Sequence, residues 1–524
     1  MSHNERDMHE HDGDDSEPEM LAEDDALEEI EGDDAEGDDV AMDSGDENDD
    51  NEELVLVNDS IAYFDLHKDS VFAIAQHPKF PALVATGGSE GDADNAPGRG
   101  YVFDTSAAAA RPLLPASYSS DPAQAQAQAS QSTELTPLFA LEGHTDSINA
   151  LAFTLPSGEF LVSGGLDGRM RVYGVAIGGG RVDFSFVGES QEVPEINWLA
   201  PCPGRDYPNT VALGASDGSV WVLSIDAGAA ASSGAIQIVQ SFFSHTAACT
   251  AGTWTPDGNL LATVSEDSSL QVWDVWGVAA GRGLVPGGAQ ALLSLTADDQ
   301  RFEVPGGLYS VAVSPGGTLV AVGGAGGVIK VVTLPRLTGA QAAGSSAGGK
   351  SAKQKGPASA SEPAAFGTIL ASIEVQTDGV ETLAFAPPPM TLLAAGSVDG
   401  SIAVFDVTRS FALRRHIQRA HDDFSVVKVE WVKSAPPSLT GGPAGVGGPA
   451  QWLLTSCGMD GVVRRWDLRK NVVPDKPGDN GMVNEWRGHR GDGEGGGVLG
   501  FVQGDTGERV VTAGDDGVVL VFEA

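Results

Sequence analysis

Cysteine is scarce in this chain. Its 524 residues include only Cys202, Cys249 and Cys457, and no two of these form a C-x-x-C pair. Zinc sites and disulfide frameworks need cysteines at closer and more regular spacing, so we expect neither. Cys249 and Cys457 lie in strand-like segments, where a reduced cysteine is typical of a packed core.

Basic residues are also few, because 30 Lys and Arg stand against 74 Asp and Glu and give a formal net charge of −44. Binding to nucleic-acid phosphates needs charge of the opposite sign, whereas a negative field attracts and steers basic partners. The composition therefore argues against direct nucleic-acid binding and favours a basic protein partner. The alternative is that the acidic residues serve solubility alone.

Long apolar runs are missing, since none reaches the roughly 20 residues that span a bilayer, and the acidic N-terminal stretch has no apolar core of the signal-peptide type. No nucleophile–base pair or metal-ligand set is recognisable. Glycine pairs such as Gly164-Gly165 stand where turns need positive φ. We therefore predict no membrane contact, no cofactor, no metal and no enzyme activity, in a monomer of the cytoplasm, with a nuclear fraction left open.

Residues 1–53 contain 26 Asp or Glu and one Arg, so they carry more than half of the net charge. A segment of this composition cannot bury enough apolar surface to offset the entropy of ordering. We predict a disordered acidic tail over 1–53 and one folded domain over 54–524.

The most informative stretch of that domain is 244–274, which has the form of one β-propeller blade. His245 opens it, a strand ends at Trp254, and turns at 256–259 and 266–268 separate two further strands, the last of which ends in Trp273-Asp274. A unit of this size cannot cover both faces of its sheet, so it implies copies of itself. The pattern is typical of a WD repeat.

A buried hydrogen-bond relay explains the polar residues of this unit. Asp267 is predicted to accept from His245, which reaches a strand hydroxyl (Thr263 or Ser265) that also pairs with the indole N–H of Trp273, because buried polar groups must be paired. The same three places are filled further on by His421, Asp460 and Trp466.

The turns that carry the acidic residue can be counted. They fall near Glu90 and at Asp167, Asp217, Asp267, Ala325, Asp399, Asp460 and Asp516. Eight such units predict an all-β fold that is a single WD-repeat β-propeller of eight blades. Seven blades are the alternative, because the first and fifth units are degenerate.

Ring closure and insertions can also be predicted. Residues 518–522 form only the third strand of the last unit, and residues 60–66 supply a spare strand that we expect to pair with it and so remove two sheet edges. Low-complexity insertions are predicted at 107–135, 338–364 and 435–449.

One face of such a ring collects the loops before each inner strand and between each second and third strand. The acidic candidates on these loops are Glu90, Asp146, Glu195, Glu266, Glu303, Asp378, Glu381, Asp423 and Asp515. The aromatic or apolar candidates beside them are Phe72, Trp198, Tyr309, Phe424 and Met459. Carboxylates orient guanidinium groups and aromatic faces hold cations, so this face is predicted to bind an extended Arg/Lys-rich peptide.

The order of several segments resembles one family. Phe64-Asp65-Leu66-His67, Ile196-Asn197-Trp198, the run 394–406 and the run 455–467 are similar to angio-associated migratory cell protein and its fungal relatives, over roughly residues 54–524. The fungal members are ribosome-assembly chaperones. The resemblance implies capture of the basic N-terminal segment of a newly made large-subunit ribosomal protein, as nascent chain or near the pre-ribosome. A general WD-repeat scaffold in signalling or cell migration is the alternative.

Overall fold

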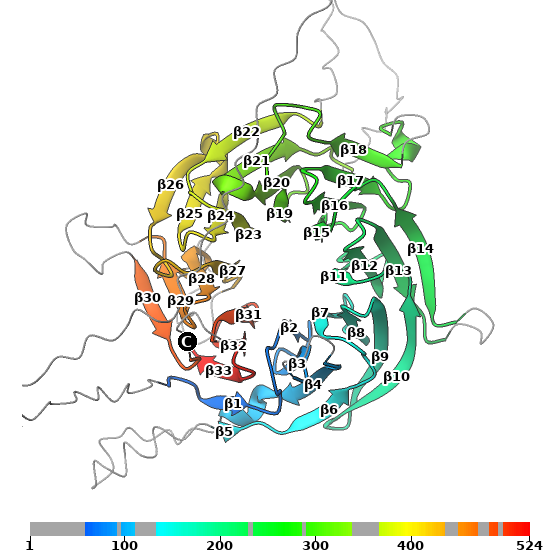
Figure 1. Ribbon diagram of the computed structural model, residues 1–524, viewed down its shortest axis with the longest axis vertical. Coiled ribbons are helices and arrows are strands. Elements are labelled where there is room, and N and C mark those ends of the chain that lie inside the picture. Colours follow the sequence, from blue (N-terminus) through cyan, green and yellow to red (C-terminus); the bar gives the residue numbers. More distant parts are fainter. Residues whose placement is uncertain are drawn as a thin grey trace, which may run out of the picture. The chain divides into compact units, whose positions relative to one another are not determined.

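The computed structural model describes residues 58–91, 96–109, 133–228, 234–285, 290–337, 366–434, 449–469, 481–490 and 496–524. Over these residues the strands form eight antiparallel sheets set around a central axis (Figure 1). This confirms the eight-bladed propeller and excludes the seven-bladed alternative, since both degenerate units form blades. The predicted tail 1–53 and the insertion 338–364 lie outside the described residues, as does 435–448 of the insertion 435–449.

Each blade takes four strands in chain order, from the inner strand to the outer one. The first four blades are β2 (Ala73–Gln76), β3 (Leu83–Ser89), β4 (Gly98–Asp104) and β6 (Pro137–Leu141); β7 (Ile148–Phe153), β8 (Phe160–Gly165), β9 (Arg169–Gly178) and β10 (Arg181–Gln191); β11 (Ile196–Pro201), β12 (Thr210–Ala215), β13 (Val220–Ile225) and β14 (Ile236–Phe242); β15 (Cys249–Trp254), β16 (Leu260–Ser265), β17 (Leu270–Asp274) and β18 (Ala291–Leu295).

The other four blades follow the same rule, except at the end of the ring. They are β19 (Leu308–Val313), β20 (Leu319–Gly324), β21 (Val328–Thr333) and β22 (Ile369–Glu374); β23 (Val380–Phe385), β24 (Leu392–Ser397), β25 (Ile402–Asp406) and β26 (Ala412–Ile417); β27 (Val426–Trp431), β28 (Leu453–Gly458), β29 (Val463–Asp467) and β30 (Met482–Trp486); β31 (Val498–Val502), β32 (Arg509–Gly514) and β33 (Val519–Glu523) with β1 (Ala62–Phe64) and β5 (Thr133–Glu134).

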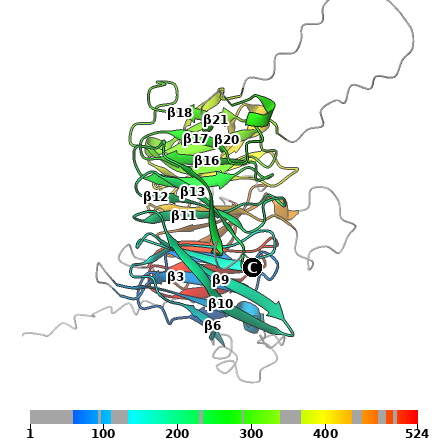
Figure 2. The ribbon, with the colours of Figure 1, turned by 90° about the vertical axis from the view of Figure 1, so that its right-hand side faces the viewer.

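Short 3-10 helices occupy some of the connections. They are η1 (Thr105–Ala109), η3 (Ala280–Arg282), η4 (Ala325–Gly327), η5 (Val407–Arg409) and η7 (Pro449–Trp452). Figure 2 shows the ring from its side, with β10 among the outer strands that cover it.

The core lies between neighbouring blades, so the second strand of each blade is buried on both faces. All six residues of β16 are buried, whereas the outer strand β14 alternates with exposed positions. The blades approach each other so closely that larger side chains would collide. A Cβ on Gly164 would lie 2.8 Å from Ile196, and one on Gly396 would lie 2.7 Å from Val426. Runs such as Ser163-Gly164-Gly165 therefore reflect the narrow packing near the axis.

The ring closes as predicted, because β1 pairs antiparallel with β33 and supplies the outer strand of the eighth blade. The insertion 107–135 differs from the prediction of a plain loop. Its first residues belong to η1, where Ala108 is buried, and Thr133–Glu134 forms β5, which pairs parallel with β1. Leu135, which follows β5, is buried in the hydrophobic core and so holds the end of the insertion in place.

Candidate functional site

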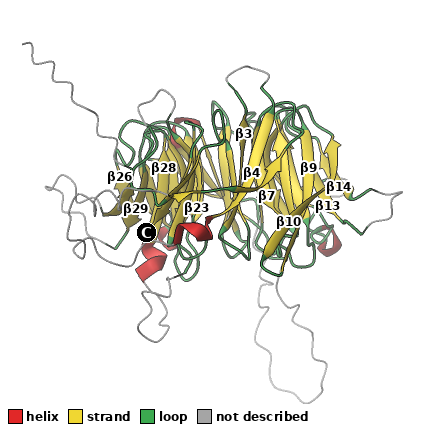
Figure 3. Ribbon diagram, turned by 90° about the horizontal axis from the view of Figure 1, so that it is seen from below, coloured by secondary structure: helices red, strands yellow, loops and turns green. Residues whose placement is uncertain are grey.

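Two loops of every blade meet on one face of the ring. In an antiparallel meander the start of the first strand and the hairpin between strands two and three lie at the same end (Figure 3). A backbone hydrogen bond ties the two loops together. The N–H of Glu266 donates to the carbonyl of Ala248 at 3.2 Å, and the N–H of Met459 donates to that of Ser425 at 3.0 Å. Side chains from both loops therefore form one surface, here called the loop face.

The relay of the seventh blade holds these loops as predicted. His421 Nδ1 lies 2.9 Å from Asp460 Oδ1, His421 Nε2 lies 2.7 Å from Ser456 Oγ, and the indole N–H of Trp466 donates to the same hydroxyl at 2.9 Å. His421 is fully buried, and this burial lowers its pKa despite the opposing effect of Asp460. The histidine is therefore a structural, neutral link between two loops rather than a metal ligand.

The fourth blade differs from its prediction in one link. His245 Nδ1 lies 2.6 Å from Ser269 Oγ and 3.9 Å from Asp267 Oδ1, so the direct contact is with the serine. Asp267 instead accepts from the backbone N–H groups of Ser269 and of the neighbouring loop. Thr263, not Ser265, is the shared hydroxyl, 2.8 Å from His245 Nε2 and 2.9 Å from Trp273 Nε1. Ser269, two residues after Asp267, therefore forms the hydrogen bond with His245 Nδ1 that was predicted for Asp267.

Five predicted acidic residues lie exposed on the loop face of four consecutive blades, three to six. We call them the acidic sector: Glu195, Glu266, Glu303, Asp378 and Glu381. Among the described residues no Lys, Arg or His lies within ion-pair distance of any of them, and the ion pairs of these parts of the ring involve other carboxylates. The inner strands β11, β15, β19 and β23 carry this sector around half of the ring (Figure 1). Their charge is therefore available to a partner.

The acidic sector is most concentrated around Tyr309. Burial raises the pKa of Tyr309, and the carboxylates of Glu381 and Glu266 raise it further. Burial also raises the pKa of Glu381, and the carboxylate of Asp378 adds to this shift. A cation that approaches such a carboxylate stabilises its charged form, because the attraction offsets the costs of desolvation and of repulsion between like charges. The tyrosine hydroxyl donates to the carbonyl of Gly306 at 2.6 Å.

Three other predicted acids lie on the loop face but have internal partners. Asp146 Oδ1 accepts from the N–H of Ser147 at 2.7 Å, and Asp515 Oδ1 accepts from the hydroxyl of Ser70 at 2.5 Å. Asp423 forms an exposed ion pair of 3.1 Å with Arg419. Only Asp423 has its charge offset by a cation, whereas Asp146 and Asp515 add their charge to that of the acidic sector.

Two predicted contacts are wrong. Glu90 takes the place of the turn acid in the first blade, where its side chain is 8 % exposed and lies 2.9 Å from Lys68 Nζ and 3.6 Å from Arg99. Its charge is therefore neutralised within the ring. Trp198 packs between the third and fourth blades, where it leaves no room for a Cβ on Gly214, and its indole N–H donates to the carbonyl of Cys249 at 3.2 Å. It joins two blades and is half-buried.

A β-bulge at the start of the inner strands unites three predicted residues, Phe72, Tyr309 and Glu381, with others that the sequence reasoning missed. The register shifts by one residue at this place in blades two to eight, and the extra residue is Asn149, Asn197, Thr250, Tyr309, Glu381, Val427 or Leu499. Phe72 precedes β2 at the equivalent place. Several of these side chains reach the next blade, as when Thr250 Oγ1 donates to the carbonyl of Leu308 at 2.6 Å. The spacing from the turn acids could have located them.

Comparisons with known proteins agree with this geometry. The family model "WD domain, G-beta repeat" matches residues 135–174, 236–274 and 367–406, each of which runs from the outer strand of one blade through the inner three of the next. The crystal structure of Sqt1 from Chaetomium thermophilum is 58 % identical, with a TM-score of 0.74, and the match covers 89 % of this chain and 98 % of that one. The chain belongs to the WD-repeat family that includes Sqt1.

A second structure of the same protein shows Chaetomium thermophilum Sqt1 bound to the N-terminus of the ribosomal protein L10. It is also 58 % identical, with a TM-score of 0.73, and the match covers 89 % of this chain and 100 % of that one. The ribosome assembly protein SQT1 of Saccharomyces cerevisiae is 32 % identical over 234 residues, which are 43 % of this chain and 44 % of the yeast protein. The matches span about half the length of the curated relatives. The relation to angio-associated migratory cell protein stays a prediction.

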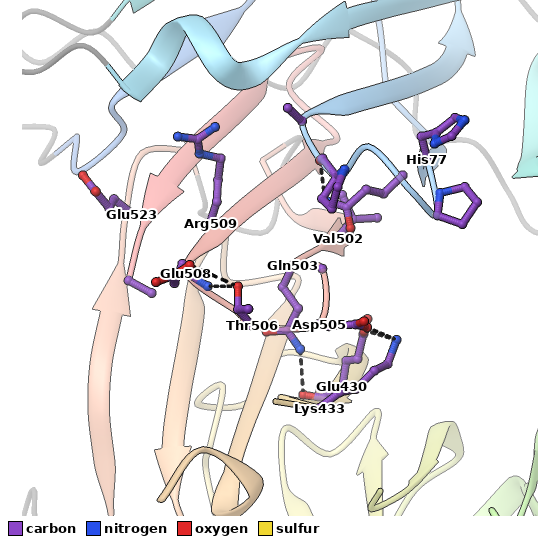
Figure 4. A pocket seen from close by; sticks show the side chains of 16 residues that line it. His77, Glu430, Lys433, Val502, Gln503, Asp505, Thr506, Glu508, Arg509 and Glu523 are labelled. Carbon is purple, nitrogen blue, oxygen red and sulfur yellow. Dashed lines mark hydrogen bonds and ion pairs between the residues drawn. The ribbon is translucent and has the colours of Figure 1, made fainter. Parts of the chain in front are cut away.

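The opposite face of this Sqt1-like ring has a different character. A cavity of about 950 Å³ lies there between the seventh, eighth and first blades (Figure 4). Some of its charges are paired internally, since Lys433 Nζ lies 3.4 Å from Asp505 and 4.0 Å from Glu430. Arg509 donates to the carbonyl of Thr105. The lining has four carboxylates against one Lys and one Arg, so the cavity is acidic but, unlike the acidic sector, contains cations.

Two short matches to catalytic patterns carry no site. Residues 214–218 fit G-x-S-x-G, but they form the end of β12 and the turn before β13, not the strand-to-helix elbow that exposes a nucleophile. Residues 344–351 fit the P-loop pattern but lie in the Gly/Ala/Ser-rich stretch outside the described residues. The described part of the chain contains no cluster of His, Cys, Asp and Glu that could hold a metal ion. It also contains no helix long and apolar enough to span a membrane.

Proposed function

We propose that this protein is a chaperone of large ribosomal subunit assembly that binds the basic N-terminal segment of a large-subunit ribosomal protein on its loop face. The acidic sector is the observation that carries the proposal, because it places five carboxylates without internal cations on four neighbouring blades. The partner recorded for Sqt1, the N-terminus of L10, supports a client of this kind.

The proposed mechanism is charge shielding. Newly made ribosomal proteins carry basic segments that attract nucleic acid, since phosphates bind Lys and Arg strongly and without regard to sequence. Carboxylates on a rigid ring pair with these side chains through charge-assisted hydrogen bonds and release them when ribosomal RNA competes. Binding of this kind needs no reaction and no cofactor. We further propose that capture takes place in the cytoplasm, where ribosomal proteins are made.

Charge reversal tests the proposal. The variant carries Glu266→Lys, Glu303→Lys and Glu381→Lys together, and its matched control carries Asp206→Lys, Asp226→Lys and Glu523→Lys, which are exposed acids of the opposite face. Binding of a synthetic peptide of the L10 N-terminal segment is measured by fluorescence anisotropy at increasing salt. An exposed pair contributes up to about 1 kcal/mol, so three reversals should weaken binding by about 100-fold or more.

The control triple changes the net charge equally and should leave the affinity within about threefold. Affinity in the wild type should fall steadily as salt rises. Binding that ignores salt, or that survives the loop-face triple, would refute the proposal. Purification of the protein with its attached ribosomes, followed by sequencing of the bound messages, would identify the client, and an absence of ribosomal-protein messages would contradict co-translational capture.

A further inference from the structure

The bulge residues change character around the ring. On the second, third and fourth blades they are Asn149, Asn197 and Thr250, which hydrogen-bond to the next blade. On the seventh, eighth and first blades the equivalent residues are Val427, Leu499 and Phe72. Phe72 is 41 % exposed, and the other two are half-buried. Their inner strands β27, β31 and β2 are consecutive in Figure 1, so the three apolar residues lie at the starts of neighbouring inner strands on the loop face.

Two further apolar residues extend this patch on the seventh blade. Phe424 is 36 % exposed in the loop before β27. Met459 lies in the adjoining turn and reaches the eighth blade, since a Cβ on Gly497 would come within 2.6 Å of its sulfur. We call the set of Phe72, Phe424, Val427, Met459 and Leu499 the apolar sector. It covers the three blades next to the acidic sector, on the same face.

Two carboxylates within the apolar sector form ion pairs, and a third accepts a hydrogen bond. Asp422 lies 3.9 Å from Arg464, Asp423 lies 3.1 Å from Arg419, and Asp515 accepts from Ser70. No carboxylate of the acidic sector forms an ion pair with a described Lys, Arg or His, although Asp378 accepts from the backbone N–H of Gly379 at 2.7 Å. The loop face is therefore divided into a part that offers unpaired charge and a part that offers apolar surface.

We infer that the loop face binds a segment of two chemistries, a run of Arg and Lys on the acidic sector that is continuous with apolar or aromatic side chains on the apolar sector. This inference rests on the proposed function and specifies the client further. A purely basic peptide would leave Phe72 and its neighbours in water, whereas apolar surface at the centre of an interface is the usual source of affinity. The acidic sector attracts many basic chains, and the apolar sector selects among them by a contact that other basic segments lack.

Paired variants of protein and peptide test the inference. The protein carries Phe72→Ser and Leu499→Ser together. Its control is Phe80→Ser, because Phe80 lies in the first blade on the opposite face and is 47 % exposed, close to the value for Phe72. The peptides are the L10 N-terminal segment and a copy in which every apolar or aromatic side chain is serine, with all charges kept. Affinities are measured as before across a salt series, and thermal unfolding verifies that each variant is folded.

The double variant should bind the native peptide at least tenfold more weakly, which corresponds to about 1.4 kcal/mol, with an unchanged salt dependence. The serine peptide should bind the wild type equally weakly and should not distinguish the wild type from the double variant, because the two changes remove the same contact. Phe80→Ser should bind as the wild type does.

Salt-dependent binding of the native peptide that is the same for the wild type and the double variant would overturn the inference and leave the proposed function intact. Equal affinities of the native and serine peptides for the wild type would do the same. Failure of the native peptide to bind the wild type at low salt would instead overturn the proposed function itself.

Discussion

Closure of the ring through β1 leads to a specific prediction for Phe64→Ala. Phe64 is fully buried, its ring stacks on Phe103 at 5.0 Å, and it also contacts Tyr101 at 5.1 Å. It is one of three β1 residues that pair with β33. Since β1 has no other large buried side chain, Phe64 is its main anchor in the core.

The expected cost follows from this burial. Truncation of a buried Phe to Ala costs about 3–5 kcal/mol, whereas each backbone hydrogen bond of a strand contributes only about 1 kcal/mol net. The pairing of Ala62 with Val521 and its neighbours cannot offset the loss. We therefore expect the free energy needed to detach β1 from β33 to be well below the free energy of unfolding of the whole ring. Detachment of β1 leaves the edge of β33 open.

Hydrogen–deuterium exchange of the segment 519–523, followed by mass spectrometry, measures this detachment. A factor of ten corresponds to 1.4 kcal/mol, so exchange there should accelerate roughly 100-fold to several thousand-fold. Phe405→Ala is the control, because Phe405 is equally buried in the sixth blade, whose four strands follow one another in sequence. Unchanged exchange of 519–523 in Phe64→Ala, or equal acceleration in the control, would refute the reasoning.

Three further predictions concern stability. Thr263→Val should lower the free energy of unfolding by about 2–4 kcal/mol in urea titrations, because it leaves two buried relay groups without a partner, whereas Thr263→Ser should cost about 1 kcal/mol. Burial lowers the pKa of His245 to about 4, so between about pH 6.5 and 4 the unfolded state binds more protons than the folded state. The thermal midpoint should therefore decrease as the pH is lowered through this range. His245→Gln, which copies Gln376 of the sixth blade, should make the midpoint depend less on pH. Gly168→Ala should destabilise the ring strongly, since its φ is +71° and the Cβ would lie 2.0 Å from a carbonyl oxygen, while Gly179→Ala, with φ +60° and no neighbour within 4 Å, should cost about 1 kcal/mol by the same assay.

The repeat residues made the fold predictable. The relay of His421, Asp460 and Trp466 belongs to the repeat pattern, and the structure places it as predicted. The contacts that failed depend on residues outside the repeat. Glu90 is paired with Lys68 and Arg99, and Trp198 lies against the next blade. An exposed loop acid and a buried one look alike in sequence, because the pairing is decided by side chains from other strands.

The sequence by itself determined the class of fold, the eight candidate units and the sign of the charge, since alternation, turn residues and composition are local properties that each unit repeats. Only the tertiary structure decided which carboxylates stay unpaired and which apolar residues share their face. That division arises from the closure of the ring, which brings the first blade beside the eighth although β2 and β31 are more than 400 positions apart along the chain.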